Sequence, residues 1–283
     1  MRGSDGMRTG GEILADQLVI HGVRHVFCVP GESYIAALDG MYGSPIELTV
    51  CRQEGGASMM AEAIGKATGR PGICFVTRGP GATNASAGLH IARQDSTPMI
   101  LFVGQIGRDM RDREAFQELD YRAVFGSIAK WVTEIDDPAR IPEYVARAYA
   151  VAMSGRPGPV VIALPEDMLC EVAQAIDRPR IERPRQAADP EAMNALAAQL
   201  ATAKAPVAII GGAGWDDEAA RDFAAFATAH GIPVAAGFRR QDAVANDCPV
   251  WAGNLGYGPN PQLTARIKAA DLILAVGARL GEA

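Results

Sequence analysis

The stretch Thr49-Val-Cys-Arg-Gln-Glu-Gly-Gly-Ala57 combines a short apolar run with a carboxylate and two glycines directly after it. A second apolar run ends in Thr77-Arg-Gly-Pro-Gly-Ala-Thr-Asn84, where a Gly-Pro-Gly turn opens a helical pattern. An apolar strand followed by a helix, twice in succession, is typical of a parallel sheet covered by helices. We therefore expect Glu54 to lie at the carboxyl end of one strand and to face the turn that ends the other.

The same alternation extends on both sides of these two segments and predicts an α/β fold with a doubly wound parallel sheet. Thr9-Gly-Gly-Glu12 is a capping-box pattern that predicts a helix start, and Gly22 predicts its end. The expected strands are apolar throughout, as in strands buried on both faces. They cover residues 25–29, 46–50, 73–77, 99–103, 128–133 and 160–164, with helices from near Glu54, from near Gly81 and over 138–153.

Ligand sites in doubly wound sheets lie beyond the carboxyl ends of the strands. Pro30 and Gly31 follow the strand at 25–29, Glu54 follows the strand at 46–50, and Thr77 ends the next one. The sheet topology therefore predicts that these residues meet at one edge, where they would form a single site.

These segments together resemble the pyrimidine-binding domain of thiamine diphosphate enzymes of the acetolactate synthase and pyruvate oxidase group. The likeness runs from Thr9 to about Pro165. It implies that Glu54 is the catalytic carboxyl, which hydrogen-bonds to the N1′ atom of the coenzyme. It also implies a set of residues around the aminopyrimidine: Pro30, Gly31, Thr77, Pro80 and Asn84. The alternative is that Glu54 is only a first-turn acid favoured by the helix dipole.

In this family the carboxyl at the Glu54 position activates the coenzyme for attack on a substrate carbonyl. The coenzyme then serves as the electron sink, and the protein orients and tunes it. A carboxyl that keeps its proton near neutrality needs a largely apolar, dehydrated setting. Gly55, Gly56 and Ala57 bring no cation, whereas Arg52 would share the direction of Glu54 only if the strand continued that far.

A long charged loop over residues 104–120 contains Ala115-Phe-Gln-Glu118. It is similar to the family segment that reaches the active site of a neighbouring subunit. The resemblance implies that Phe116 packs near the substrate and that Gln117 hydrogen-bonds beside the coenzyme. It also implies a homodimer or homotetramer with its active site at a subunit interface. The alternative is an ordinary solvated loop.

Proline and arginine are dense between Cys170 and Pro190, which favours an extended linker. We place the pyrimidine-binding domain at 1–175, the linker at 176–189 and a second, incomplete Rossmann-like α/β domain at 190–283. In the second domain we expect a helix at 190–204 and strands at 207–210, 232–236 and 272–276. Gly211-Gly-Ala-Gly214 follows the first of these strands, but it is not a full dinucleotide fingerprint.

The second domain resembles the start of the family's central domain, which holds FAD in some members. Gly277-Ala-Arg279 departs from the pattern of the FAD-binding members, so the sequence disfavours FAD. Family members also carry a third domain whose Gly-Asp-Gly motif holds Mg²⁺ against the coenzyme diphosphate. That tripeptide is absent here. We therefore expect no metal ligand in this chain, and we favour a fragment of a longer enzyme over one half of a split enzyme.

For the whole enzyme we expect decarboxylation of a 2-oxo acid with carboligation, as in acetolactate synthase. Glu32 and Glu166 place carboxylates at the predicted pocket rim, which disfavours a second acidic substrate. Oxalyl-CoA decarboxylase-like and sulfoacetaldehyde acetyltransferase-like enzymes are therefore alternatives. A noncatalytic module that binds a nucleotide at Gly211 to Gly214 is an alternative of another class.

Composition limits the partners of the chain. The 283 residues include 27 Lys and Arg against 33 Asp and Glu, a net charge of -6, which argues against nucleic acid or an anionic membrane. No apolar run reaches the roughly 20 residues that span a bilayer, and Met1-Arg-Gly-Ser-Asp-Gly6 lacks the core of a signal peptide. We expect a cytoplasmic protein. Its five cysteines show no Cys-x-x-Cys spacing, so neither a zinc site nor a disulfide framework is expected.

Overall fold

The computed structural model of the chain describes residues 6–183 and 187–281. It divides into two compact units, Met1–Pro184 and Arg185–Ala283. The division falls inside the segment 176–189 that we expected to be a linker, and 184–186 lie outside the described residues, as do 1–5 of the polar start. Within the described ranges, no helix is long and apolar enough to cross a membrane.

The first unit contains a six-stranded sheet in the order β3-β2-β4-β5-β7-β6, in which every neighbouring pair is parallel. Its strands are β2 His25–Cys28, β3 Glu47–Val50, β4 Gly72–Val76, β5 Met99–Gln105, β6 Trp131–Glu134 and β7 Pro159–Pro165. The predicted α/β class and parallel sheet are confirmed. The strand β6 begins later than expected, because the amides of Ile128 and Ala129 donate to the carbonyl of Phe125 and so finish the preceding helix.

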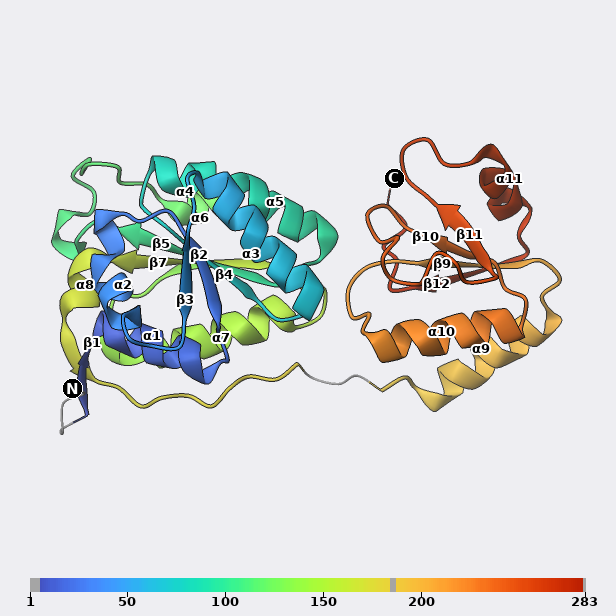
Figure 1. Cartoon of the computed structure of the whole chain (residues 1–283), viewed down its shortest axis with the longest axis horizontal. Helices are drawn as coiled ribbons and strands as arrows, with labels where there is room; N and C mark the ends of the chain where they lie inside the picture. Colours follow the sequence, from blue (N-terminus) through green and yellow to red (C-terminus); the bar gives the residue numbers. More distant parts are fainter. Residues whose placement is uncertain (1–5, 184–186, 282–283) are drawn as a thin grey trace. The chain divides into compact units, whose positions relative to one another are not determined.

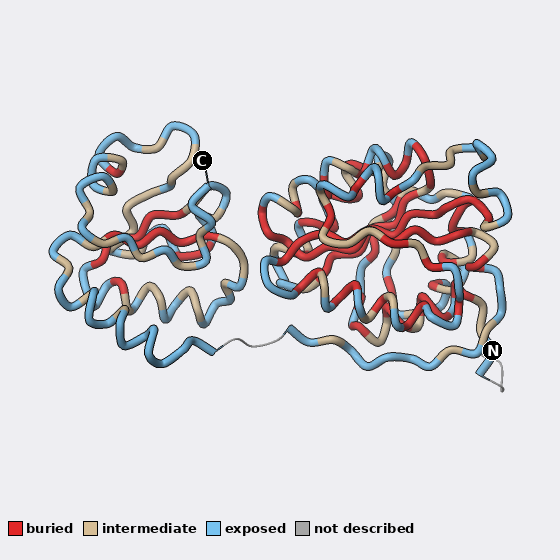
Figure 2. The backbone as a smooth tube through the Cα atoms, turned by 180° about the vertical axis from the view of Figure 1, so that it is seen from behind, coloured by how far each residue is buried: buried red, intermediate tan, exposed pale blue. Residues whose placement is uncertain are grey.

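Helices cover both faces of this sheet, as Figure 1 shows. One apolar cluster lies under α1 Gly10–Ile20, α2 Ile35–Met41, α7 Ile141–Met153 and α8 Glu166–Cys170. The other lies under α3 Glu54–Thr68, α4 Pro80–Asn84, α5 Ser86–Asp95 and α6 Tyr121–Phe125. The strands β4, β5 and β7 are consequently buried along their whole length (Figure 2).

Local signals fix where the helices that frame the site begin. The capping box of α1 forms as predicted: Thr9 Oγ1 accepts from the Glu12 amide at 3.2 Å, and the Thr9 amide donates to Glu12 Oε2 at 2.8 Å. The helix α3 begins at Glu54, because the Gln53 side chain accepts from the Gly56 amide at 2.9 Å. Since β3 ends at Val50, strand alternation does not extend to Glu54.

The strand order creates a topological switch between β2 and β4. From β2 the chain moves outward to β3, and it then returns across β2 to form β4. The loops that leave β2 and β4 therefore run in opposite directions, and in open α/β sheets the ligand crevice lies between the carboxyl ends of two such strands. The segments after Cys28 and Val76 border this crevice.

Two features of the first unit were not predicted. The short strands β1 Met7–Thr9 and β8 Val172–Gln174 pair antiparallel beside the main sheet. The chain beyond β8, which we expected to be a solvated connector, is held on the first unit. Gln17 exchanges two hydrogen bonds with the backbone of Arg178, at 2.8 and 2.9 Å. The buried Gln17 amide thus obtains its partners from a segment far away in the sequence.

The second unit has a four-stranded parallel sheet in the order β11-β10-β9-β12. Its strands are β9 Pro206–Ile210, β10 Val234–Ala236, β11 Trp251–Asn254 and β12 Leu272–Val276, with helices α9 Pro190–Thr202, α10 Asp217–Ala229 and α11 Pro261–Ala269. The strand β11 escaped prediction because Trp-Ala-Gly-Asn is not an apolar run.

Gly72 allows α3 to lie directly on β4. A Cβ at Gly72 would stand 1.8 Å from the Ala61 carbonyl oxygen, which belongs to the helix backbone and cannot turn aside. We expect Gly72→Ala to lower the free energy of unfolding by about 1–3 kcal/mol, measured by urea denaturation. Gly56→Ala in the same helix is the control, because its Cβ would meet nothing within 4 Å. Equal effects of the two changes would contradict this packing argument.

Candidate active site at the strand exits

The Glu54 carboxylate lies against the Gly-Pro-Gly turn. The Asn84 side-chain amide donates to Glu54 Oε2 at 3.1 Å. A Cβ at Gly81 would lie 3.4 Å from Glu54 Oε1 and 2.7 Å from Thr77 Cγ2. Glu54 is half-buried at the first residue of α3. The structure therefore brings together Glu54, Thr77, Gly81 and Asn84, which come from two different strand exits.

The exit of β2 packs against the exit of β4 on the other side of Thr77. A Cβ at Gly31 would stand 2.5 Å from Thr77 Cβ, and Ser33 Oγ lies 2.9 Å from Thr77 Oγ1. Pro30 and Pro80 are exposed beside these contacts. A side chain at position 31 would therefore collide with Thr77, and only glycine fits there.

The loop with Phe116 and Gln117 joins the same edge. The Phe116 residue is 72 % exposed, so its ring points away from the core of its own chain. Gln117 has a left-handed backbone with φ +66, and a Cβ at Gly79 would stand 2.7 Å from Gln117 Cβ. Gln117 thus rests on the Gly79 turn, and it also lines a cavity of about 890 Å³ between the loop and the ends of the strands.

Arg78 connects these segments and was missed from the sequence. Only 7 % of the residue is exposed. Its Nε donates to the Phe116 carbonyl at 3.0 Å, Nη1 to Glu166 Oε2 at 2.9 Å and Nη2 to Glu32 Oε1 at 3.2 Å. The sequence contains one hint of this role, which is that Arg78 is a cation among the small residues of the Gly-Pro-Gly motif. The repulsion that we inferred from Glu32 and Glu166 is therefore partly offset, because the two carboxylates share one guanidinium.

Tyr121 stabilises the Gly-Pro-Gly turn through a hydrogen bond. Its hydroxyl accepts a hydrogen bond from the buried Gly79 amide at 3.0 Å. Burial raises the pKa of Tyr121 to about 12, although the bond from Gly79 opposes the shift. The phenol is thus neutral at about pH 7, where it accepts the hydrogen bond of the Gly79 amide.

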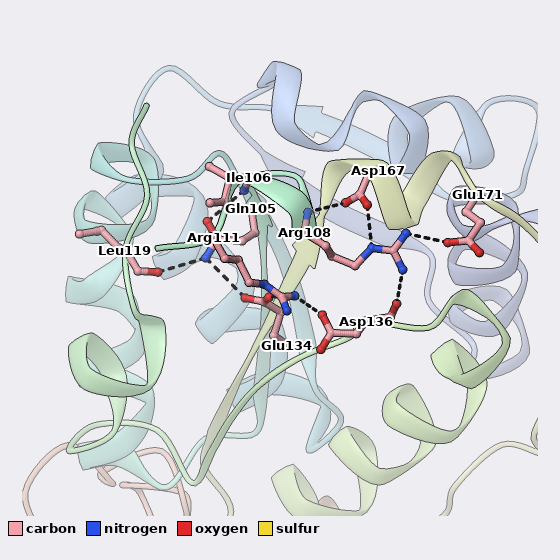
Figure 3. A network of polar contacts seen from close by, with 9 residues as sticks. All are labelled: Gln105, Ile106, Arg108, Arg111, Leu119, Glu134, Asp136, Asp167 and Glu171. Carbon is pink, nitrogen blue, oxygen red and sulfur yellow. Dashed lines mark hydrogen bonds and ion pairs between the residues drawn. The ribbon is translucent and has the colours of Figure 1, made fainter. Parts of the chain in front are cut away.

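A second arginine ties the start of the loop to the end of β7. The Arg108 backbone amide and Nε donate to the Asp167 carboxylate at 3.0 and 2.7 Å, and Nη2 donates to Glu171 at 2.7 Å. Its Nη1 reaches the Asp136 carbonyl at 2.5 Å. Burial opposes ionisation of Asp167, but the bonds from Arg108 outweigh it and hold the pKa of Asp167 below its usual range. Figure 3 shows this network.

The same network continues beneath the loop. Arg111 contacts the carboxylates of Glu134 and Asp136, and Gln105 Nε2 donates to the Leu119 carbonyl at 3.0 Å (Figure 3). Burial raises the pKa of Glu134, while Arg111 works in the opposite direction. Ion pairs of Arg108 and Arg111 therefore fix the beginning of the loop that carries Phe116, and a hydrogen bond from Gln105 fixes its end.

In the second unit the glycine cluster has a packing role. A Cβ at Gly212 would stand 2.2 Å from the Gly277 carbonyl oxygen, and one at Gly277 would stand 2.6 Å from the Gly211 carbonyl oxygen. Trp215 Nε1 also donates to the Gly211 carbonyl at 2.9 Å. Close approach of the β9 and β12 exits thus accounts for these glycines without a nucleotide. Within residues 6–183 and 187–281, no three His, Cys, Asp or Glu side chains group as a metal site.

Comparison with known families agrees with this geometry. Residues 8–124 match the thiamine pyrophosphate enzyme, N-terminal TPP binding domain, and residues 193–283 match the thiamine pyrophosphate enzyme, central domain. The chain therefore belongs to the thiamine pyrophosphate enzymes, thiamine pyrophosphate being the same compound as thiamine diphosphate.

Two bacterial relatives named acetolactate synthase align with nearly the whole chain, and a mitochondrial one aligns with part of it. The acetolactate synthase of Bacillus subtilis is 32% identical over 271 residues, which are 95% of this chain and 47% of that protein. The large subunit of acetolactate synthase isozyme 2 from Escherichia coli is also 32% identical, over 96% of this chain and 50% of its own length. The mitochondrial acetolactate synthase of Schizosaccharomyces pombe is 39% identical over 58% of this chain. The chain spans about half the length of the two bacterial relatives.

Removal of the Tyr121 hydroxyl leaves the Gly79 amide buried without its acceptor. We expect Tyr121→Phe to lower the free energy of unfolding by about 1–3 kcal/mol in urea denaturation. Tyr42→Phe is the matched control, because Tyr42 is 90 % exposed. If Tyr121→Phe is as stable as the control, the hydroxyl does not support the turn.

Glu118 closes the loop by accepting from the amides of Asp112 at 2.8 Å and Ala115 at 3.0 Å. These bonds lower the pKa of Glu118 in the folded state. A lowered folded pKa stabilises the fold above the unfolded pKa, and the gain is lost as pH falls through the folded pKa. We expect Glu118→Gln to destabilise the chain more at about pH 7 than at about pH 3, below the unfolded pKa of about 4.3. If Glu118→Gln lowers the free energy of unfolding in urea by the same amount at both pH values, this expectation is refuted.

Proposed function

We propose that the whole enzyme, of which this chain forms two domains, decarboxylates a 2-oxo acid and joins the product to a second carbonyl compound, as an acetolactate synthase does. The observation that carries the proposal is the Glu54 carboxylate, which Asn84 holds at 3.1 Å beside the Gly-Pro-Gly turn at the topological switch. The printed names of the relatives support the same reaction.

The residues at the crevice fit the pyrimidine half of thiamine diphosphate. Gly31 and Gly81 let the backbone of two segments approach Thr77 closely, and Gly81 also lies beside Glu54 Oε1. A ring nitrogen such as N1′ needs a carboxyl partner, which the half-buried Glu54 offers next to Gly81. Exposed Pro30 and Pro80 border the same crevice. We therefore assign the ring to the space among these residues, with Asn84 at its edge.

When bound, thiamine diphosphate supplies a carbanion equivalent that attacks the substrate carbonyl and accepts electrons during decarboxylation. The role of Glu54 is to hold a proton at N1′, and the role of Asn84 is to fix the direction of that carboxyl. Glu54 is half-buried in this chain alone. We expect a second subunit to complete the dry surroundings that such a proton requires.

We assign Phe116, Gln117 and Glu32 to the substrate side of the site. Phe116 is the exposed aromatic of the loop, and Gln117 offers an amide next to the Gly79 turn. Glu32 is held by Arg78 at 3.2 Å, so an anionic substrate meets a partly neutralised rim. One guanidinium offsets one of the two carboxylates, which weakens the objection to an acidic acceptor, and none of the contacts described above favours the decarboxylase or acetyltransferase alternatives.

The remaining components belong to the whole enzyme. We propose a homodimer or homotetramer with the site at a subunit interface, consistent with the outward Phe116 ring. Mg²⁺ would be held by residues beyond this chain, and FAD stays disfavoured because the glycines at β9 and β12 serve packing. The five cysteines are all free, as thiols are in the cytoplasm.

The test replaces Glu54 by Gln in the whole enzyme. We expect the C2 proton of bound thiamine diphosphate to exchange with D₂O about 10²–10⁴-fold more slowly, since general acid–base catalysis is worth this much. Rapid-quench NMR measures the exchange, and circular dichroism checks the fold. Glu47→Gln is the control, because Glu47 lies on the exposed edge strand β3. If Glu54→Gln leaves the rate of C2 proton exchange unchanged, Glu54 does not have this role. A noncatalytic module predicts that result.

A further inference from the structure

We propose that Arg78 is a positioning residue, which fixes the Phe116–Gln117 peptide beside the site and uses Glu32 and Glu166 as its permanent counter-ions. The contacts of Arg78 carry the structural part of this inference. Its consequence for catalysis rests on the function proposed above.

One guanidinium joins the exits of four strands that are neighbours in the sheet. Arg78 itself follows β4, and its three partners follow the adjoining strands: Glu32 comes after β2, Phe116 after β5 and Glu166 after β7. A guanidinium has several N–H donors in a rigid plane, so it can bind three acceptors in fixed directions. A lysine ammonium at this position is a point charge without such a fork.

Burial makes these pairings obligatory. Arg78 is 7 % exposed, whereas the side chains of Glu32 and Glu166 are 69 % and 44 % exposed. A buried cation is tolerated only when it is paired and hydrogen-bonded. Both carboxylates therefore turn toward Arg78, and without it two negative charges would face the site unopposed.

The carbonyl that Arg78 binds lies at a strained point of the loop. Asp112, Glu114 and Gln117 all have positive φ, at 60, 51 and 66. Residues other than glycine rarely adopt a backbone conformation with positive φ, and it persists only where surrounding contacts enforce it. The Phe116 carbonyl belongs to the peptide that precedes Gln117. The bond from Arg78 therefore fixes the plane of that peptide and supports the left-handed turn at Gln117.

The direction of two side chains depends on this peptide. The Phe116 ring is exposed, so the backbone sets where it points. Gln117 lies over Gly79, where a Cβ would stand 2.7 Å from Gln117 Cβ. If the peptide rotated, both side chains would leave their present positions, while the buried sheet beneath would keep its structure.

Hydrogen exchange of the chain without coenzyme tests the structural part. We expect Arg78→Met to speed exchange of the amides in 112–119 about tenfold, because a lost bond to a charged group shifts local opening by at least this factor. Amides of β5 should be unaffected. Arg156→Met is a control for the loss of an arginine that binds a backbone carbonyl, here that of Arg93, although Arg156 is exposed and precedes β7 at the opposite end of the sheet.

Arg78→Lys separates charge from geometry. We expect it to recover most of the melting temperature, since a cation still faces the carboxylates, but to leave exchange in 112–119 fast. Full protection of the loop in Arg78→Lys would overturn the proposal, because charge alone would then suffice. Equal acceleration in 112–119 and β5 would also overturn it, since Arg78 would then act on global stability. Should Arg78→Met not fold, Arg78→Lys decides by the same comparison.

In the whole enzyme, Arg78→Met should lower kcat/KM for a 2-oxo acid such as pyruvate about tenfold or more through misplacement of the loop, and it should slow C2 proton exchange of the bound coenzyme much less than Glu54→Gln does. Loss of that exchange in Arg78→Met would place Arg78 in coenzyme activation and contradict a positioning role. If the unmodified enzyme shows no C2 proton exchange of the coenzyme, the proposed function is refuted. Amide hydrogen exchange of residues 112–119 in the isolated chain would still decide the structural inference.

Discussion

The close approach of Gly31 and Gly81 to Thr77 is the constraint on which the site depends. Neither glycine has space for a Cβ, and the contact of Gly31 with Thr77 joins the exit of β2 to the exit of β4. These two exits are close because β2 and β4 are neighbours in the sheet, although the loops that leave them run in opposite directions. Glu54 can face the crevice because α3 begins at that residue and the strand before it has already ended.

Much of this could be predicted because the signals are local. Apolar runs located the central strands, the capping box located α1, and the order of strands and turns brought Glu54 and Thr77 to one edge. The failures share a physical cause, which is that they depend on partners distant in sequence. Gln17 hydrogen-bonds to the backbone of Arg178, and the sequence around either residue contains no pattern that predicts this pairing. The strand β11 exists because β10 pairs with it.

Arg78 shows the same limit within the site. Its position in the Gly-Pro-Gly motif was visible, but its meaning depends on Glu32 and Glu166, which lie 46 and 88 residues away. From the sequence alone, each carboxylate counted as a separate negative charge at the rim. The fold places one buried cation between them. Electrostatic arguments about pocket entrances therefore require the three-dimensional pairing, since the list of charges does not determine it.

The left-handed backbone at Gln117 restricts how this region could be redesigned. A residue there must carry the chemistry of the site and also accept a conformation that β-branched side chains strongly resist. Asparagine keeps an amide and tolerates this conformation, whereas valine or isoleucine would force the turn to open. Libraries that vary substrate preference would therefore gain more from the neighbouring Phe116, whose backbone does not share this restriction.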